Sequence, residues 1–519
     1  MQRSSETARS DSAATELFAP APPPPSEASG ATPLRVDGPV VDRARSALFA
    51  KPALAVATLM GLAVAIELVP GLARLRLFGQ RPEAPAATAP MATAPKEIGE
   101  ATLETESKNT ATLEPESDRA EERSPEGTRA GLVAPPIETE EPPLPLTDAS
   151  GKALDGFYAA LAETALGKAG AVTRIAHFGD SIIVSDFVSG TLRRIFQREF
   201  GDAGHGYMLI ANAWPAYAHN DVYRFASSGW KVSRIVGPLA PDGLYGLGGV
   251  SFKAPPGVRA RFGTEDEGQF GRSVSRFVLS YLEQPGGGRI EINVDGSHHA
   301  DVDAAGPEKR VRAYEVKVPD GPHQFEIVTR TGMPRAFGVV LERNQAGVVL
   351  DALGVQGARI RFLDKMDDEH FAEQLRWRSP DLVIFQFGAN ESGDGFAYPM
   401  PEYYATMRAV LEQTRRALPD SGCLVLSAMD RARRKDNVLE SLPIIPLIVK
   451  EQTRAAHDVG CAFFDTYRAM GGHGSMATWV RRGLGQADLT HPTGVGSQVL
   501  GKWIFRALMQ GYNAYLARR

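Results

Sequence analysis

From residue 149 onward, apolar residues follow two spacings that alternate along the chain. Strands are predicted where apolar residues run continuously or nearly so, at residues 173–179, 347–355, 380–388, 423–430 and 461–467. Helices are predicted where apolar residues recur every three to four positions, near residues 154–168, 187–201, 367–377, 401–417, 436–458 and 494–515. Because apolar strands alternate with helices, the pattern is typical of a parallel sheet covered by helices on both faces.

The segment between the first two predicted strands has a different pattern. Residues 222–348 contain short alternating runs, such as RFVLSYLE and RIEINVDG, separated by Gly, Pro and Asp turns. This spacing indicates an antiparallel β-sandwich. We therefore predict an α/β domain formed by residues 149–221 and 349–519, interrupted by a β-domain at residues 222–348.

The first 148 residues lack this order of elements. Residues 1–46 are rich in Pro, Ala and Ser and are predicted to be disordered. Residues 47–73 contain an uncharged apolar stretch from 52 to 66 that runs on through Glu67 to Leu72, a length close to the roughly 20 residues that span a bilayer. Residues 74–148 are rich in Pro, Ala, Thr and Glu and predict a disordered linker. We interpret residues 47–73 as a single membrane anchor, because a buried helix would find nothing to pack against between such flanks.

Composition narrows the possible functions. The chain has 519 residues and a formal net charge of −5, without the basic excess that nucleic-acid binding requires, so we expect no nucleic-acid partner. Its two cysteines are too few for a thiolate metal site or a disulfide framework. We interpret Cys423 and Cys461 as buried free thiols. A disulfide is possible if their two strands are neighbours, but a bridge across adjacent strands needs unusual geometry.

Residues able to do chemistry follow the predicted strands. Gly-Asp-Ser at 179–181 ends the first strand, Gly357 follows the second and Asn390 follows the third. Asp488 and His491 stand just before the last helix. Ligands of an open parallel sheet bind beyond the carboxyl ends of its strands, so we expect these residues at one edge of the sheet.

Each residue type fits a role in acyl transfer. A serine hydroxyl becomes a nucleophile when a base takes its proton, and His491 would be that base for Ser181. Asp488 would fix the tautomer of the imidazole and stabilise the imidazolium. The N–H groups of Ser181 and Gly357 and the side-chain amide of Asn390 would donate to the oxyanion. Taken singly, these residues could instead cap helices or close turns.

The order of these blocks resembles that of the SGNH, or GDSL-type, hydrolases. That family has GDS after the first strand, Gly after the second, G-x-N after the third and D-x-x-H near the C-terminus; here the blocks read FGDS, GVQGAR, FGAN and DLTH. The segments REFGDAGHGY and VLDALGVQGAR, with the β-insert between them, are most similar to the peptidoglycan O-acetylesterase branch. The resemblance covers about residues 171–515. Two positions depart from the pattern: Ile182 stands where many relatives have His, and Glu391 stands where Asp is commoner.

The resemblance implies a fold, an activity and a site. The fold would be a flavodoxin-like three-layer α/β/α domain with an insert similar to a carbohydrate-binding module. Ser181 would be the nucleophile, Asp488 and His491 its triad partners, and Ser181, Gly357 and Asn390 the oxyanion donors. The enzyme would remove O-acetyl groups from a cell-envelope glycan such as peptidoglycan, as a membrane-anchored protein whose catalytic domain lies in the periplasm or cell envelope. No metal or organic cofactor is implied.

Two further functions stay open at this point. The same triad could serve an O-acetyltransferase in which a sugar hydroxyl replaces water. Alternatively, the chain could be a membrane-tethered glycan-binding protein whose insert supplies the function. An ordinary α/β-hydrolase is disfavoured, because no G-x-S-x-G sequence occurs.

A few other residues allow two interpretations. Arg431, in a basic loop after the fourth predicted strand of the α/β domain, is either a solvated loop residue or a contact for an anionic substrate. Trp214 and Tyr217 either line a sugar site or pack at the domain junction. His298 and His299 fit an exposed loop, and we assign no metal site.

Overall fold

The computed structural model describes residues 134–519. The predicted tail (1–46), the predicted membrane anchor (47–73) and most of the predicted linker (74–148) lie outside the described residues. Within residues 134–519, no helix has both the length and the hydrophobicity needed to cross a membrane.

A five-stranded parallel sheet forms the centre of the α/β domain. Its strands are β1 (Val172–Gly179), β13 (Gly347–Gly354), β14 (Leu382–Gln386), β15 (Gly422–Leu426) and β18 (Ala462–Phe464). They lie in the order β13-β1-β14-β15-β18, with every pair parallel. Because the first strand of the chain lies between the second and the third, this is the flavodoxin-like order, in which ligands bind at the carboxyl ends of the strands beside β1.

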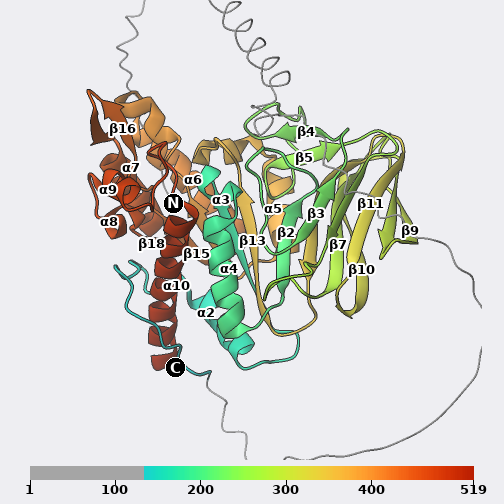
Figure 1. Cartoon of the computed structure of the whole chain (residues 1–519), viewed down its shortest axis with the longest axis horizontal. Coiled ribbons are helices and arrows are strands. Elements are labelled where there is room, and N and C mark those ends of the chain that lie inside the picture. Colours follow the sequence, from blue (N-terminus) through green and yellow to red (C-terminus); the bar gives the residue numbers. More distant parts are fainter. Residues whose placement is uncertain (1–133) are drawn as a thin grey trace, which may run out of the picture. The chain divides into compact units, whose positions relative to one another are not determined.

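Helices cover both faces of this sheet. On one face, α2 (Asp155–Ala165), α4 (Phe187–Phe200) and α10 (Gly494–Ala517) lie side by side (Figure 1). The other face packs against α5 (Asp368–Arg378), α6 (Met400–Ala417) and α7 (Ile445–Val459). Successive strand residues alternate between the two cores, as Ile384 and Phe385 of β14 do. The α/β prediction is confirmed, with the three layers that the resemblance implied.

The connections at the edge of the sheet contain short elements. They are α3 (Ser181–Val184), α8 (Thr466–Met470), α9 (Ser475–Arg481), the 3₁₀ helices η2 (Ile360–Lys365) and η3 (Glu391–Ala397), and the hairpin strands β16 (Ala432–Lys435) and β17 (Val438–Ser441). The predicted helix at 436–458 was therefore wrong over its first part, since α7 begins only at Ile445. Asp436 and Asn437 have φ values of 47° and 62°, the left-handed conformation that a two-residue hairpin turn requires.

Between β1 and β13 the chain forms two antiparallel sheets. The first has the order β10-β7-β12-β5-β4 with β2 paired to β12, and the second has the order β3-β6-β11-β8-β9. The strands are β2 (Gly204–Leu209), β3 (Tyr223–Ala226), β4 (Lys231–Arg234), β5 (Val250–Lys253), β6 (Arg259–Gly263), β7 (Val274–Glu283), β8 (Arg289–Val294), β9 (Ser297–Asp303), β10 (Arg310–Gly321), β11 (Gln324–Thr331) and β12 (Arg335–Glu342).

Side chains from the two antiparallel sheets share one core. The Phe277 ring of β7 stacks on the Phe325 ring of β11, with ring centroids 5.1 Å apart. β2 lies before residue 222, so the chain joins these sheets earlier than the predicted start of the insert. The link between β2 and the α/β domain is tight, because the Tyr207 N–H donates to Asp351 of β13 at 2.8 Å.

The last residues of the predicted linker pack on the α/β domain. Ile137 exchanges two hydrogen bonds with the Asn513 side chain of α10, at 2.8 and 2.7 Å. Thr147 forms an antiparallel bridge with Phe463 of β18. The prediction of a linker up to residue 148 was therefore too long, because apolar residues among the prolines, such as Leu144 and Leu146, pack against the core.

The prediction of two free thiols was wrong. Cys423 and Cys461 form a disulfide, with Cα atoms 4.7 Å apart. The reason lies in the strand register: β15 and β18 are neighbours, and Leu424 pairs with Ala462, so the two cysteines stand opposite each other one residue earlier. Their Cα separation lies within the usual range for a disulfide.

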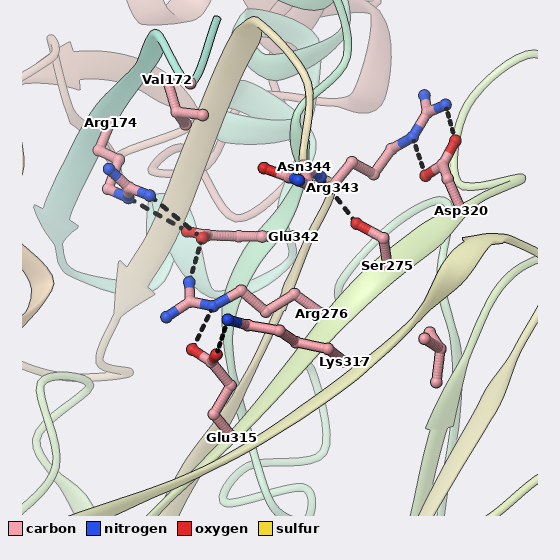
Figure 2. Close-up of a pocket in the computed structure, with 12 residues that line it drawn as sticks. Val172, Arg174, Ser275, Arg276, Glu315, Lys317, Asp320, Glu342, Arg343 and Asn344 are labelled. Carbon is pink, nitrogen blue, oxygen red and sulfur yellow. Dashed lines mark hydrogen bonds and ion pairs between the residues drawn. The ribbon is translucent and has the colours of Figure 1, made fainter.

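A network of ion pairs joins the two domains at the amino-terminal end of β1. Glu342 of β12 accepts hydrogen bonds from Arg174, Arg276 and Arg378. Figure 2 shows those from Arg174 and Arg276. Burial raises the pKa of Glu342, but Arg378 and Arg174 outweigh this effect and hold the pKa well below its usual range. The pocket of about 500 Å³ beside this network lies at the opposite end of β1 from Ser181. This pocket therefore lies at the junction between the two domains and is not the candidate active site.

Candidate active site

The turn after β1 places Ser181 at the carboxyl edge of the sheet. Asp180 caps α3 by accepting a hydrogen bond from the Ile182 N–H at 3.1 Å, and Ser181 is the first residue of that helix. Gly179 leaves no room for a side chain, because a Cβ there would lie 2.5 Å from Ile183 Cγ1. The close approach of strand and helix at this glycine fixes the position of the serine.

Ser181, His491 and Asp488 form a chain of hydrogen bonds. Ser181 Oγ lies 2.7 Å from His491 Nε2, and His491 Nδ1 lies 2.6 Å from Asp488 Oδ2. Asp488 Oδ1 also accepts the backbone N–H groups of Thr490 and His491, both at 3.0 Å. Burial raises the pKa of Asp488, but the hydrogen bonds from His491 and Thr490 outweigh it, so the pKa is lower than usual. An ionised Asp488 keeps a proton on Nδ1 and leaves Nε2 free to accept one from the serine.

Gly357 and Asn390 lie at the ends of the strands that flank β1. The Asn390 amide donates one N–H to the Ala358 carbonyl at 2.8 Å, and its second amide hydrogen has no acceptor among residues 134–519. Gly357 has φ +79°, a conformation that favours glycine, and its surroundings are open. Within residues 134–519, the N–H groups of Ser181 and Gly357 have no hydrogen-bond acceptor. The structure thus brings the three predicted oxyanion donors to the same edge of the sheet as the hydrogen bonds that join Ser181, His491 and Asp488.

The two departures from the family pattern are buried. Ile182 is 5% exposed and packs into the core between the sheet and α4. Glu391 has no exposed surface and accepts the Ile360 N–H at 2.9 Å, which ties η3 to η2 beside Gly357. Neither side chain faces the space above Ser181, so both act through the position of the loops.

Two buried carboxyl groups beside the site were not assigned a role from the sequence. Burial raises the pKa of Asp180 to about 7, and the nearby Glu391 contributes to this rise. Burial also raises the pKa of Glu391 to about 7. Each has one carboxyl oxygen that is buried without a hydrogen-bond partner in the described part of the chain. The only sequence signal was their place directly beside Ser181 and Asn390.

Arg431 connects the loops that carry the site. Its Nε donates to Thr490 Oγ1 at 2.9 Å, and its Nη1 donates to the Ala389 carbonyl at 2.8 Å. Thr490 and Ala389 are the neighbours of His491 and Asn390 in the sequence. The guanidinium of Arg431 therefore lies between the loop that carries His491 and the loop that carries Asn390. Arg431 is not a solvated loop residue.

Other residues considered from the sequence lie apart from this chemistry. Trp214 and Tyr217 are each 6% exposed, and the Tyr217 hydroxyl accepts the Leu209 N–H at 2.9 Å, so both pack at the junction and neither offers a free face to a sugar.

His298 lies with Glu291 and Asp301, their ligand atoms within 4.8 Å of one another. Glu291 is held by the Arg330 guanidinium at 2.6 and 2.7 Å, which already balances its charge. We assign no metal to that group.

A serine hydrogen-bonded to a histidine at the edge of a flavodoxin-like sheet is the arrangement of an acylhydrolase. Residues 327–499 match the model of the GDSL-like lipase/acylhydrolase family. Over this third of the chain the protein is similar to the GDSL-like acylhydrolases, which identifies it as an esterase. The match begins after Ser181, whose block is separated from the others by the antiparallel sheets. A search of curated proteins by sequence found no match.

Solved structures are similar to this one. A structure of a peptidoglycan O-acetylesterase aligns with a TM-score of 0.61 and 22% identity, over 71% of this chain and 99% of the other. A family two carbohydrate esterase from Cellvibrio japonicus aligns with a TM-score of 0.24 and 13% identity, over 57% of this chain and 99% of the other. The first similarity shows a shared fold that extends over nearly the whole of the other chain.

Proposed function

We propose that the protein hydrolyses acetyl esters of a glycan with Ser181 as nucleophile, His491 as base and Asp488 as the group that orients the base. The observation that carries the proposal is the continuous hydrogen-bonded chain from Ser181 Oγ through His491 to Asp488. The distance of 2.7 Å from Ser181 Oγ to His491 Nε2 is short enough for proton transfer from the hydroxyl to the imidazole, and the 2.6 Å contact with Asp488 orients the ring.

The reaction follows from this geometry. Ser181 Oγ attacks the acetyl carbonyl while His491 Nε2 takes its proton, and Asp488 stabilises the resulting imidazolium. The tetrahedral oxyanion accepts hydrogen bonds from the N–H groups of Ser181 and Gly357 and from the Asn390 amide. The imidazolium then gives its proton to the departing sugar oxygen. Water, activated by the same histidine, attacks the acetyl-enzyme and releases acetate.

For the substrate we propose an O-acetylated cell-envelope glycan such as peptidoglycan. The fold is shared with a peptidoglycan O-acetylesterase, which supports this choice. We also propose that the catalytic domain works outside the cytoplasm and that residues 47–73 anchor it to a membrane. The Cys423–Cys461 disulfide supports this location, since disulfides persist in oxidising compartments.

The decisive experiment compares wild type with Ser181→Ala on 4-nitrophenyl acetate and on O-acetylated peptidoglycan. We expect wild type to release acetate from both, and Ser181→Ala to lose activity by a factor of about 10⁴ or more at an unchanged melting temperature. Full activity in Ser181→Ala would refute the nucleophile. Adding a glycan acceptor tests the alternative of an O-acetyltransferase, for which acetyl transfer to the acceptor would exceed acetate release.

A further inference from the structure

Arg431 is a partly buried cation without an ion pair. Its guanidinium hydrogen bonds go to neutral groups, the Thr490 hydroxyl, the Ala389 carbonyl and the Ser392 hydroxyl. No carboxylate of residues 134–519 lies within ion-pair distance of it. Burial lowers the pKa of Arg431, and the charges of Asp180 and Asp488 offset this only in part.

The fully buried arginines of the described residues are all paired, unlike the partly buried Arg431. Arg193 is bound to Asp186, Arg378 to Asp351 and Glu342, and Arg335 to Asp242. Arg431 bonds only neutral groups, so its positive charge is not neutralised by an ion pair although part of the side chain is removed from water. Its Nη2 group makes no hydrogen bond within residues 134–519 and is not fully buried. A donor is therefore available there for a ligand.

This guanidinium lines a pocket of about 310 Å³ between η3 and the β16–β17 hairpin. The pocket is formed by Ser392, Gly393, Gly395, Phe396, Arg431, Ala432, Arg433, Leu442, Pro443 and Ile444. Two of these residues are arginines and none is acidic. Phe396 is 68% exposed at the rim, so the pocket combines an apolar surface with positive charge.

The pocket adjoins the proposed site through Arg431 itself. The guanidinium holds Thr490, and the next residue is His491, whose Nε2 binds Ser181 Oγ. It also holds Ala389, and the next residue is Asn390, the proposed oxyanion donor. None of the proposed catalytic residues lines the pocket, so we infer that it takes a substituent next to the ester and not the acetyl group itself.

We propose that this pocket binds a carboxylate of the ester substrate, with Arg431 as the residue that recognises it. The proposal rests on the proposed esterase function and specifies its substrate as an acetylated glycan that carries a carboxylate near the acetylated sugar. One unpaired guanidinium balances one negative charge, which is the charge of a carboxylate. Arg433 adds positive potential at the rim, although it is itself paired with Glu440 at 3.3 Å.

The chain offers a matched pair of variants that alter the pocket without removing Arg431. A Cβ at Gly393 would lie 3.6 Å from Arg431 Nη1, an ordinary contact distance, with nothing closer. Gly393→Asp therefore introduces a carboxylate that competes for the guanidinium. Gly393→Asn has nearly the same shape and no charge, so it controls for steric effects.

The substrates are acetylated oligogalacturonides with free carboxylates and the same oligosaccharides after methyl esterification. We expect wild type to favour the free acid by about tenfold or more in kcat/KM, as for a charge-assisted hydrogen bond. Gly393→Asp and Arg431→Gln should bring the ratio close to one, whereas Gly393→Asn and Arg431→Lys should retain most of the preference. Each variant is normalised to its own activity on 4-nitrophenyl acetate, so a general loss of activity leaves the ratio unaffected.

The outcomes separate the two proposals. If wild type hydrolyses 4-nitrophenyl acetate but does not distinguish the two oligosaccharides, the carboxylate subsite is refuted and the esterase is not. The same holds if Gly393→Asp and Gly393→Asn change the ratio equally. If wild type hydrolyses no ester at all, the proposed function itself fails.

Discussion

Asp488 holds His491 through both oxygens of one carboxylate. Oδ2 lies 2.6 Å from the imidazole Nδ1, and Oδ1 accepts the backbone N–H of the same histidine at 3.0 Å. The three-residue spacing in the sequence makes this possible, because a single loop presents both the backbone and the ring of His491 to one side chain. The ring has therefore little freedom to turn away from Ser181.

Replacing Asp488 with Asn tests this relationship. An amide at this position can keep the backbone contacts, but its NH₂ group would face Nδ1 and force the ring proton onto Nε2, where it blocks proton transfer from Ser181. We expect kcat for 4-nitrophenyl acetate to fall by about 10⁴-fold with little change in KM. Asp420→Asn, at an exposed position, is the control. A decrease of less than tenfold would contradict the role of Asp488.

Gly179→Ala should displace the serine without changing any polar group. The new Cβ would lie 2.5 Å from Ile183 Cγ1 and 3.0 Å from the Gln386 carbonyl oxygen, so β1 and α3 must move apart. We expect a loss of stability of about 1–3 kcal/mol, measured by urea unfolding, together with a large decrease in kcat. Gly494→Ala is the matched control, because a Cβ there meets nothing within 4 Å. If Gly179→Ala and Gly494→Ala changed the free energy of unfolding and kcat equally, the tight turn at Gly179 would be contradicted.

Glu391 should make stability depend on pH. Its pKa is about 7 in the folded protein, above the value of about 4.3 expected in the unfolded chain. Between these values the folded state binds more protons, so the free energy of unfolding decreases as pH rises through this window and stays low above it.

Glu391→Gln removes this titration. The free energy of unfolding at pH 8 should exceed that of wild type by on the order of 1–3 kcal/mol, with little difference at pH 4. Denaturant unfolding at both pH values measures the effect, with the exposed Glu402→Gln as control. A Glu391→Gln protein that is less stable at pH 8 would show that the carboxylate is needed in its ionised form.

The Cys423–Cys461 disulfide should stabilise the domain. The cysteines are 38 residues apart in the sequence, and closing a loop of this length in the unfolded chain contributes about 3–4 kcal/mol. We expect Cys423→Ala/Cys461→Ala to lower the free energy of unfolding by an amount of this order. Alkylation of the denatured wild-type protein should label no thiol until a reductant is added. Labelling without reductant would contradict the bond.

The sequence predicted those features that depend on local pattern. Apolar strands alternating with helices predicted the parallel sheet, and parallel strands bring their carboxyl ends to one edge, which is where Ser181, Gly357 and Asn390 lie. What it missed depends on contacts between distant segments. The disulfide required knowing that β15 and β18 are neighbours, and the packing of Ile137 on Asn513 is hidden within a proline-rich stretch. The unpaired state of Arg431 follows from its surroundings and has no signature in the sequence.

The attachment of Ile137 to Asn513 fixes where the described chain meets the α/β domain. α10 begins just after His491 and runs to Asn513, a distance of about 29 Å at 1.5 Å per residue. The described chain thus enters the domain at one end of α10, and the proposed catalytic residues lie at the other.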